Sequence, residues 1–296
     1  MGNYLAPAVD GPRRLRHLLS AGEPILAPGA YDALGARLIE QAGFEAVYMT
    51  GFGTAASLLG RPDVGLVTMT EMVDNARRIA RACSLPVIAD ADTGYGNAIS
   101  VVRTVQEYEQ AGVAGIHIED QVAPKKCGHM EGKQVIPADE MLTKIRAAVA
   151  ARQDDDFVVI ARTDARAVEG LDAALDRARR YRDAGADVLF VEAATSEEEI
   201  ERVAAELHDV PLLFNWAEGG KTPPVPYDRL RQFGFRIVIF PISLLLTAMA
   251  SMRRVLTEIR TAGTPIPIMD ELPRFAEFLD VIGLPEIREL EAKFIS

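Results

Sequence analysis

The sequence predicts an α/β protein with a (β/α)8 barrel of the TIM type, and three observations support this fold. Eight short apolar runs, rich in β-branched residues, recur along the 296 residues, as expected for parallel strands that are buried on both faces. Segments rich in Ala, Arg and Glu with helical spacing separate the runs. Several of these segments end in a glycine just before the next run, where a left-handed residue stops a helix.

Each expected strand is followed by an expected helix. The strands are predicted at residues 24–27, 46–49, 86–89, 115–118, 157–160, 187–191, 211–214 and 236–240. The clearest helices are predicted at residues 99–110, 171–182 and 197–207, and the glycine stops at Gly43, Gly112, Gly185 and Gly234. An open doubly wound sheet is the alternative, but its Gly-x-Gly-x-x-Gly phosphate loop does not follow the first strand.

The C-terminal segment is expected to be separate from the barrel, with a boundary between residues 1–262 and 263–296. Residues 264–267 are a Pro-containing stiff linker, and a helical apolar stripe follows at Phe275, Phe278, Leu279 and Ile282. Such a stripe must be buried against a partner. That partner is either a neighbouring subunit or the chain's own barrel.

Composition excludes several classes of protein. The net charge of −11 leaves no excess of Lys and Arg for sequence-independent nucleic-acid binding. The only two cysteines, Cys83 and Cys127, are too few for a disulfide framework and fit a reducing cytosol. The longest apolar stretch, residues 237–250, is interrupted and too short to span a bilayer. We therefore expect a cytoplasmic protein without a membrane partner.

Polar residues follow six of the expected strands. A barrel builds its active site from the carboxyl ends of its strands, so these residues should converge. They are Thr50, Gly51, Asp90, Asp92, Glu119, Asp120, Arg162, Asp164, Glu192 and Asn215.

Asp90 and Asp92 suggest a metal site. Carboxylates two residues apart on an extended segment point to the same side, and they repel each other unless a cation lies between them. Magnesium suits such a pair. An N-cap and turn with Gly94 and Gly96 is the alternative.

Cys127 lies between Lys125 and His129. Nearby cations favour the thiolate and lower the pKa of a cysteine, so this thiol could donate a proton near neutral pH. A solvated basic loop with an incidental cysteine is the alternative.

These motifs together resemble the isocitrate lyase and phosphoenolpyruvate mutase superfamily, and within it the branch of methylisocitrate and dimethylmalate lyases. Lys-x-Cys-Gly-His is specific to the lyases of the superfamily. The matching stretches run through most of the chain in family order: residues 48–53, 90–96, 118–121, 125–129, 161–165 and 215–223.

The resemblance implies a magnesium-dependent lyase, with Mn2+ as the alternative ion. It would cleave the C2–C3 bond of a 2-hydroxy di- or tricarboxylate into a 2-oxo acid, such as pyruvate, and an enolate that must be protonated. Four carboxylates would hold the metal, two of them largely through water: Asp90, Asp92, Asp63 and Glu119.

The resemblance also implies roles for the other residues. Cys127 would protonate the enolate, with Lys125 and His129 setting its ionisation, and Arg162 would stabilise the alkoxide. Tyr48 would be the base or the group that orients it. The substrate would lie against the backbone N–H groups of Thr50, Gly51 and Phe52, and against Gly128, Glu192, Asn215, Gly219, Gly220 and Pro241.

Departures from the family pattern bear on the substrate. Methylisocitrate lyases typically carry Phe-Gly at Gly219-Gly220 and more basic residues at 130–132, so this chain favours a dicarboxylate resembling 2,3-dimethylmalate. Pro241 replaces the serine usual in oxaloacetate hydrolases, which argues against that activity. Residues 218–221 also resemble carboxyphosphonoenolpyruvate mutases, which leaves a phosphonomutase open. A non-catalytic metabolite-binding barrel is the alternative from another class.

Several residues also have a structural interpretation. Glu192 could be the partner of an arginine, and His117 is expected to be a core histidine. Residues 154–156 precede a strand, so the three aspartates there are expected in a solvated turn. The resemblance further implies a C-terminal helix swapped between subunits, in dimers that pair into a homotetramer.

Overall fold

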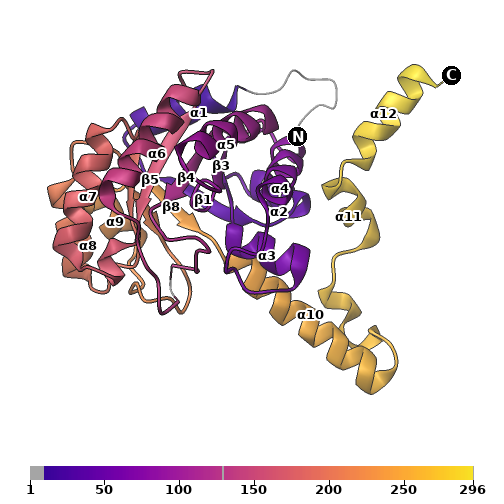
Figure 1. Cartoon of the computed structure of the whole chain (residues 1–296). Coiled ribbons are helices and arrows are strands. Elements are labelled where there is room, and N and C mark those ends of the chain that lie inside the picture. The colour runs from indigo at the N-terminus through magenta and orange to yellow at the C-terminus, as the bar shows by residue number, and fades with distance from the viewer. Residues whose placement is uncertain (1–9, 129, 296) are drawn as a thin grey trace.

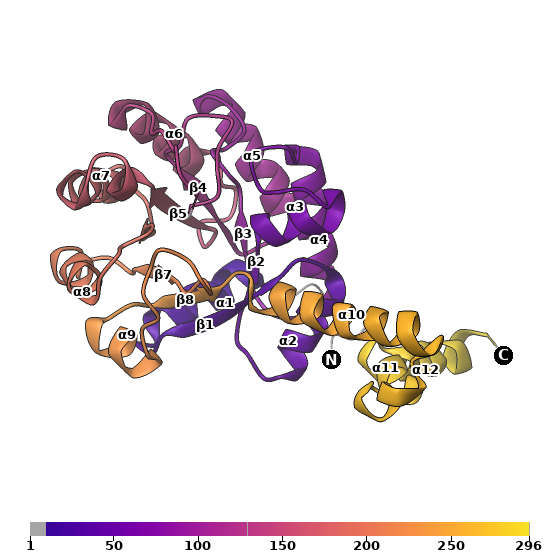
Figure 2. The same cartoon turned by 90° about the horizontal axis from the view of Figure 1, so that it is seen from below.

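Eight parallel strands form the centre of the computed structural model, which describes residues 10–128 and 130–295. Their order is β6-β5-β4-β3-β2-β1-β8-β7. A parallel bridge between Leu189 and Leu212 joins the two ends of this order and closes the barrel (Figures 1 and 2). The predicted barrel is confirmed, and the doubly wound sheet is wrong. The strands are β1 Ile25–Ala30, β2 Val47–Met49, β3 Val87–Asp90, β4 Gly115–Glu119, β5 Val158–Thr163, β6 Val188–Val191, β7 Leu213–Asn215 and β8 Ile237–Phe240.

Helices surround the strands, as Figure 2 shows. The four predicted glycine stops all have positive φ, which explains why helices end there. The helices of the barrel are α1 Gly11–Ser20, α2 Ala33–Gln41, α3 Gly51–Leu59, α4 Met69–Ala82, α5 Ala98–Ala111, α6 Ala138–Ala151, α7 Leu171–Asp183, α8 Glu197–Glu206 and α9 Tyr227–Phe233, with a 3-10 turn η1 at Ala165–Ala167.

Two apolar layers form the core. One fills the barrel with strand residues such as Ile88, Ile160 and Ile239, and Leu15 of α1 packs into it. The other lies between the strands and the surrounding helices. Arg16 of α1 donates to the carbonyl of Asp156 at 3.0 Å, just before β5. Helix α1 therefore covers the amino-terminal end of the barrel, and residues 154–156 form the expected turn there.

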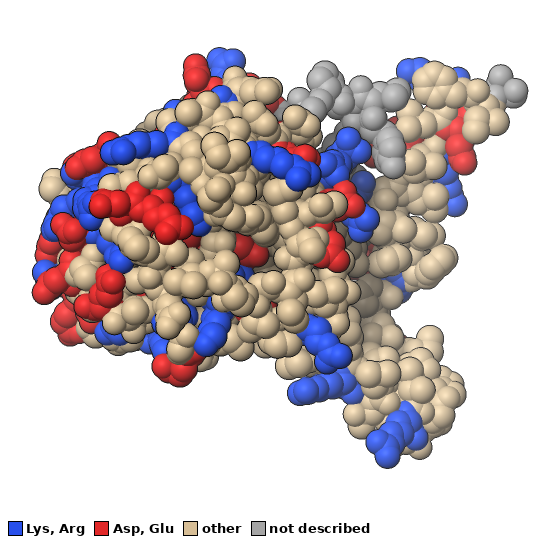
Figure 3. All heavy atoms as spheres, in the orientation of Figure 1, with Lys and Arg blue, Asp and Glu red and all other residues tan. Residues whose placement is uncertain are grey.

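The C-terminal arm first extends away from the barrel and then turns back past it (Figures 1 and 2), where Arg37 of α2 donates to the Val281 carbonyl at 3.2 Å. It comprises α10 Ser243–Ala262, η2 Ile266–Glu271, α11 Phe275–Val281 and α12 Leu284–Phe294. Helix α10 has no fully buried residue, and the expected boundary between residues 262 and 263 stays a prediction. Phe275, at 76 % exposed, shows that the predicted apolar stripe is not covered by the chain's own barrel. Tan surface accordingly dominates the lower end of the arm in Figure 3.

None of the helices in the described part of the chain is both long enough and apolar enough to cross a membrane.

Candidate active site

Three buried aspartates gather near the carboxyl end of β3. Asp90 is the last residue of β3, Asp92 follows it, and Asp63 comes from the segment after α3. The Nζ atom of Lys125 lies 2.6 Å from Asp63 Oδ2 and 2.7 Å from Asp92 Oδ1. The ammonium group of Lys125 therefore pairs with two of these carboxylates, and its expected effect on Cys127 stays a prediction.

The expected geometry required Asp92 to continue the extended strand, but it does not. Its φ of 47° is left-handed, and its N–H donates to Asp90 Oδ1 at 2.9 Å. The carboxylate of Asp90 thereby stabilises a strained turn. The two aspartates are still neighbours, through a turn in place of strand alternation. Gly94 and Gly96, both with positive φ, continue this turn.

The carboxylates fit a hard divalent cation. Glu119 Oε1 is a buried oxygen without a hydrogen-bond donor among the described residues, whereas Asp92 Oδ1 has the Lys125 ammonium group 2.7 Å away. Burial raises the pKa of Asp92 to about 7 and that of Glu119 above its ordinary value. Within residues 10–128 and 130–295, no three acidic, histidine or cysteine side chains lie close enough to enclose an ion alone. An ion held here would therefore take few carboxylates directly and complete its coordination with water and substrate.

Tyr48 and His117 lie side by side inside the barrel. The Tyr48 hydroxyl and His117 Nε2 are 2.9 Å apart. Burial, with the charge of Asp90, raises the pKa of Tyr48 well above 10, and burial lowers the pKa of His117 to about 4. Tyr48 therefore stays protonated at neutral pH. Its contact with His117 fits the expected role of orienting group, and the role of base stays a prediction. His117 is a buried core histidine, as expected.

Helix α3 begins beside Asp90. The Thr50 N–H donates to the Ala30 carbonyl at 3.2 Å, so it is occupied, contrary to its expected role in binding a carboxylate. Gly51 and Phe52 form the first turn of α3, whose N–H groups have no partner within the helix. A Cβ at Gly51 would overlap Asp90 Oδ2, so only glycine allows this approach. The helix start can thus receive an anionic group next to the carboxylates.

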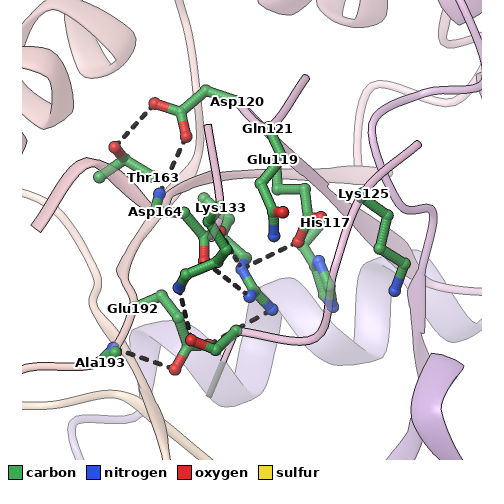
Figure 4. A network of polar contacts seen from close by, with 12 residues as sticks. His117, Glu119, Asp120, Gln121, Lys125, Lys133, Thr163, Asp164, Glu192 and Ala193 are labelled. Atoms are coloured by element: carbon green, nitrogen blue, oxygen red, sulfur yellow. Dashed lines mark hydrogen bonds and ion pairs between the residues drawn. The ribbon is translucent and has the colours of Figure 1, made fainter. Parts of the chain in front are cut away.

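Arg162 is surrounded by three carboxylates from the ends of β4, β5 and β6, and Figure 4 shows these three as Glu119, Asp164 and Glu192. Its Nε lies 2.9 Å from Asp164 Oδ2 and 3.1 Å from Glu119 Oε2, and its Nη1 lies 3.3 Å from Glu192 Oε2. These partners keep the buried guanidinium charged. The interpretation of Glu192 as the partner of an arginine is therefore correct. Asn215 also reaches Glu192, with Nδ2 3.1 Å from Oε2.

The loop that carries Cys127, called the thiol loop below, lies over Arg162. The Cys127 N–H donates to the Asp63 carbonyl at 3.1 Å. A Cβ at Gly128 would lie 2.8 Å from Glu192 and would overlap Arg162, so the Gly128 backbone packs directly against that ion pair. The structure therefore brings the thiol loop, Arg162 and the aspartates into one site. His129 lies outside the described residues.

Lys133 is a buried residue of the site that the sequence did not indicate. Its Nζ lies 2.6 Å from Asp164 Oδ1 and also donates to the Gly128 carbonyl. It follows no strand and belongs to no recognisable motif, so no local pattern marked it.

Asp120 points away from Glu119, as Figure 4 shows. It accepts hydrogen bonds from the Thr163 hydroxyl at 2.7 Å, the Asp164 N–H at 2.9 Å and the Tyr181 hydroxyl at 2.8 Å. Asp120 thus holds the end of β5 in place and does not point into the site, although it follows a strand as the other site residues do.

The segment of residues 215–224 lines a cavity of about 330 Å³ at the end of β7. Gly219 and Gly220 belong to its lining. Lys221 of this segment pairs with Glu131 of the thiol loop at 2.6 Å, which connects the two loops. Pro241, directly after β8, is buried, and its carbonyl lies close to Gly29.

A family model described as phosphoenolpyruvate phosphomutase matches residues 15–260. The chain belongs to this family. Its relatives in the family include a 2,3-dimethylmalate lyase of Eubacterium barkeri, 48 % identical over 95 % of this chain and 97 % of the relative. A 2-methylisocitrate lyase of Aeropyrum pernix is 46 % identical over 94 % and 89 % of the two chains. The expected superfamily is therefore confirmed.

Solved structures of the family agree with the fold. A 2,3-dimethylmalate lyase superposes with a TM-score of 0.92 at 45 % identity, covering 97 % of this chain and 96 % of the other. An oxaloacetate acetylhydrolase with 3,3-difluorooxalacetate gives 0.91 at 43 % identity and 96 % coverage of both chains. A phosphonopyruvate hydrolase with oxalate and Mg2+ gives 0.89 at 32 % identity, covering 97 % and 99 %.

Proposed function

We propose that the chain is a carbon–carbon lyase that cleaves a 2-hydroxy dicarboxylate of the 2,3-dimethylmalate type into a 2-oxo acid and a carboxylic acid. The observation that carries this proposal is the packing of Gly128 against Arg162 and Glu192, because it brings Cys127 to the arginine and to the aspartates. The names of the relatives at 46–48 % identity support the class of reaction.

The steps have candidate residues. A general base accepts the hydroxyl proton, with Tyr48 as that base or as the group that orients it, and Arg162 would stabilise the alkoxide that remains. Its electrons form the C2 carbonyl as the C2–C3 bond breaks, and the bonding pair leaves on C3 as an enolate. Cys127 Sγ would give C3 its proton. Gly51 and Phe52 N–H groups would hold the carboxylate of the oxo acid.

A divalent cation is part of the proposal. Asp90 and Asp92 would hold it, with Asp63 and Glu119 acting largely through water, and when bound it would polarise the forming carbonyl. Mg2+ is the proposed ion, with Mn2+ as the alternative. The buried Glu119 Oε1, which has no donor among the described residues, supports a cation at this place.

The preference for a dicarboxylate rests on the charges near the 215–224 cavity. Lys221, the lysine of that segment, pairs with Glu131, which reduces the positive charge available to a third carboxylate. A 2-methylisocitrate lyase is therefore the second candidate. Pro241 supplies no hydroxyl, which argues against an oxaloacetate hydrolase. A phosphonomutase is the remaining alternative within the family.

The Cys127→Ser variant tests catalysis against simple binding. We expect turnover to fall by about 10²–10⁴-fold, while the affinity for oxalate, measured by calorimetry with Mg2+, stays within about threefold. Cys83→Ser is the matched control, because Cys83 is a buried thiol at the end of α4, just before the amino-terminal end of β3 and not at the carboxyl ends of the strands. Unchanged turnover in Cys127→Ser would contradict the proposed acid.

We further propose a homotetramer in which the arm, residues 243–295, covers a neighbouring barrel. The exposed side chains of Met252, Leu256 and Phe275 support it, since each is at least 61 % exposed in the single chain. Light scattering of the intact chain should give four times the 32.2 kDa protomer mass. A monomer at micromolar concentration would contradict this.

We also propose that the protein is located in the cytoplasm.

A further inference from the structure

Lys133 is a buried lysine between the thiol loop and Asp164 (Figure 4). Its side chain is 2 % exposed, and its ammonium group contacts the Gly128 carbonyl and Asp164 Oδ1. We propose that Lys133 is a positioning residue that fixes the Cys127–Gly128 segment over the site by holding the Gly128 carbonyl. The catalytic part of this inference rests on the proposed function, whereas the loop contact itself does not.

The Cys127–Gly128 segment is held from both ends of its backbone. On one side the Cys127 N–H donates to the Asp63 carbonyl at 3.1 Å. On the other side the Gly128 carbonyl accepts from Lys133. Gly128 also packs against Glu192 without room for a Cβ. The hydrogen bond from Lys133 therefore attaches the loop where it contacts the ion pair of Arg162 and Glu192, and loss of Lys133 removes this attachment.

Asp164 connects this attachment to the arginine. The same carboxylate binds Lys133 Nζ at 2.6 Å and Arg162 Nε at 2.9 Å. Its own main-chain N–H donates to Asp120 Oδ1 at 2.9 Å, which fixes it to the end of β4. A buried ion pair is weak support for stability by itself. Asp164, however, binds both Lys133, which holds the loop, and Arg162. We infer that Asp164 sets the position of the loop relative to Arg162.

The two cysteines allow a direct test without any substrate. The intact protein is treated with iodoacetamide, and the alkylation of each thiol is followed by mass spectrometry. In Lys133→Met we expect Cys127 to react about tenfold faster, because a hydrogen bond to a charged group no longer holds the loop. Cys83, which is buried in the core and not near the loop, should stay protected. Lys133→Arg, which keeps the charge, should restore part of the protection.

Lys126→Met is the matched control, because Lys126 donates at 2.8 Å to the Gly132 carbonyl on the exposed side of the same loop. We expect less than about a twofold change there. If Lys133→Met does not fold, Lys133→Gln gives the same readout. Equal alkylation of Cys127 in wild type and variant would overturn the proposal, as would faster alkylation of both cysteines together, which indicates general loosening.

Turnover supplies the second measurement. We expect Lys133→Met to lower kcat about tenfold or more with a smaller change in KM, because misplacement of the acid affects the chemical step. If the wild type turns over none of the hydroxy acids, the proposed lyase fails, and the alkylation result still decides the role of Lys133.

Discussion

The phenolic oxygen of Tyr48 lies 2.9 Å from Nε2 of His117, and both side chains are buried inside the barrel. His117 Nε2 is also 3.7 Å from Asp90 Oδ1, so this pair lies between the apolar core and the candidate metal site. The high pKa of Tyr48 makes the phenol a hydrogen-bonding group at neutral pH.

Tyr48→Phe tests this role. The variant removes the hydrogen-bond partner of His117 Nε2, whose Nδ1 already has none among the described residues, so we expect unfolding in urea to show a loss of about 1–3 kcal/mol. We expect kcat/KM to fall only about tenfold, with an unchanged pH profile. A loss above about 10³-fold, with one limb of the pH profile removed, would show that the phenol transfers a proton.

Gly51→Ala should impair the site without unfolding the protein. The new methyl group would overlap Asp90 Oδ2, so we expect weaker Mg2+ binding and a loss of kcat/KM of about 100-fold. Gly11→Ala is the control, because a Cβ there meets its nearest atom at an ordinary 3.6 Å. Calorimetric titration with Mg2+ measures the effect, and equal Mg2+ affinities in both variants would speak against a cation beside Asp90.

Arg162→Met should destabilise as well as inactivate. Glu119, Asp164 and Glu192 would lose their common cation, so we expect a loss of about 3–5 kcal/mol in the free energy of unfolding. Arg166→Met removes a partly exposed pair with Glu199 at 2.8 Å and should lose at most about 1 kcal/mol. Urea denaturation of the two variants distinguishes these cases, and similar losses would refute the clustered arrangement.

Cys83 predicts a pH dependence of stability. Burial raises the pKa of its thiol to about 11, so between about pH 9 and 11 the unfolded chain ionises while the folded chain does not. The protonated Cys83 thiol therefore makes its full contribution to the free energy of unfolding below pH 9, and this contribution is lost as the pH rises to 11. We expect wild type to lose about 2 kcal/mol more than Cys83→Ala between pH 8 and 11. Parallel pH curves for the two proteins would contradict this.

The apolar runs predicted the strands because buried parallel strands need continuous hydrophobic sequence. The polar residues at the strand ends predicted much of the site, because a barrel builds its site at the carboxyl ends of its strands. Asp90, Glu119, Arg162 and Glu192 lie there. Strand alternation could have separated Glu119 from Asp120, because adjacent residues point to opposite sides.

Other features could not be predicted locally. The contact of Lys133 with Asp164 and that of Lys125 with Asp63 join residues far apart in sequence through loops. Loops have no periodicity that indicates burial. The turn at Asp92 depends on a hydrogen bond to Asp90, which replaces the strand geometry that the spacing suggested.

The most direct test of the proposed lyase is a coupled assay for released 2-oxo acid with 2,3-dimethylmalate, 2-methylisocitrate, isocitrate, citramalate and oxaloacetate, in Mg2+ and then in EDTA. We predict pyruvate release from 2,3-dimethylmalate that EDTA abolishes and added Mg2+ restores. No release from any of the hydroxy acids, with Mg2+ present and the protein folded, would contradict the lyase and direct attention to phosphonate substrates.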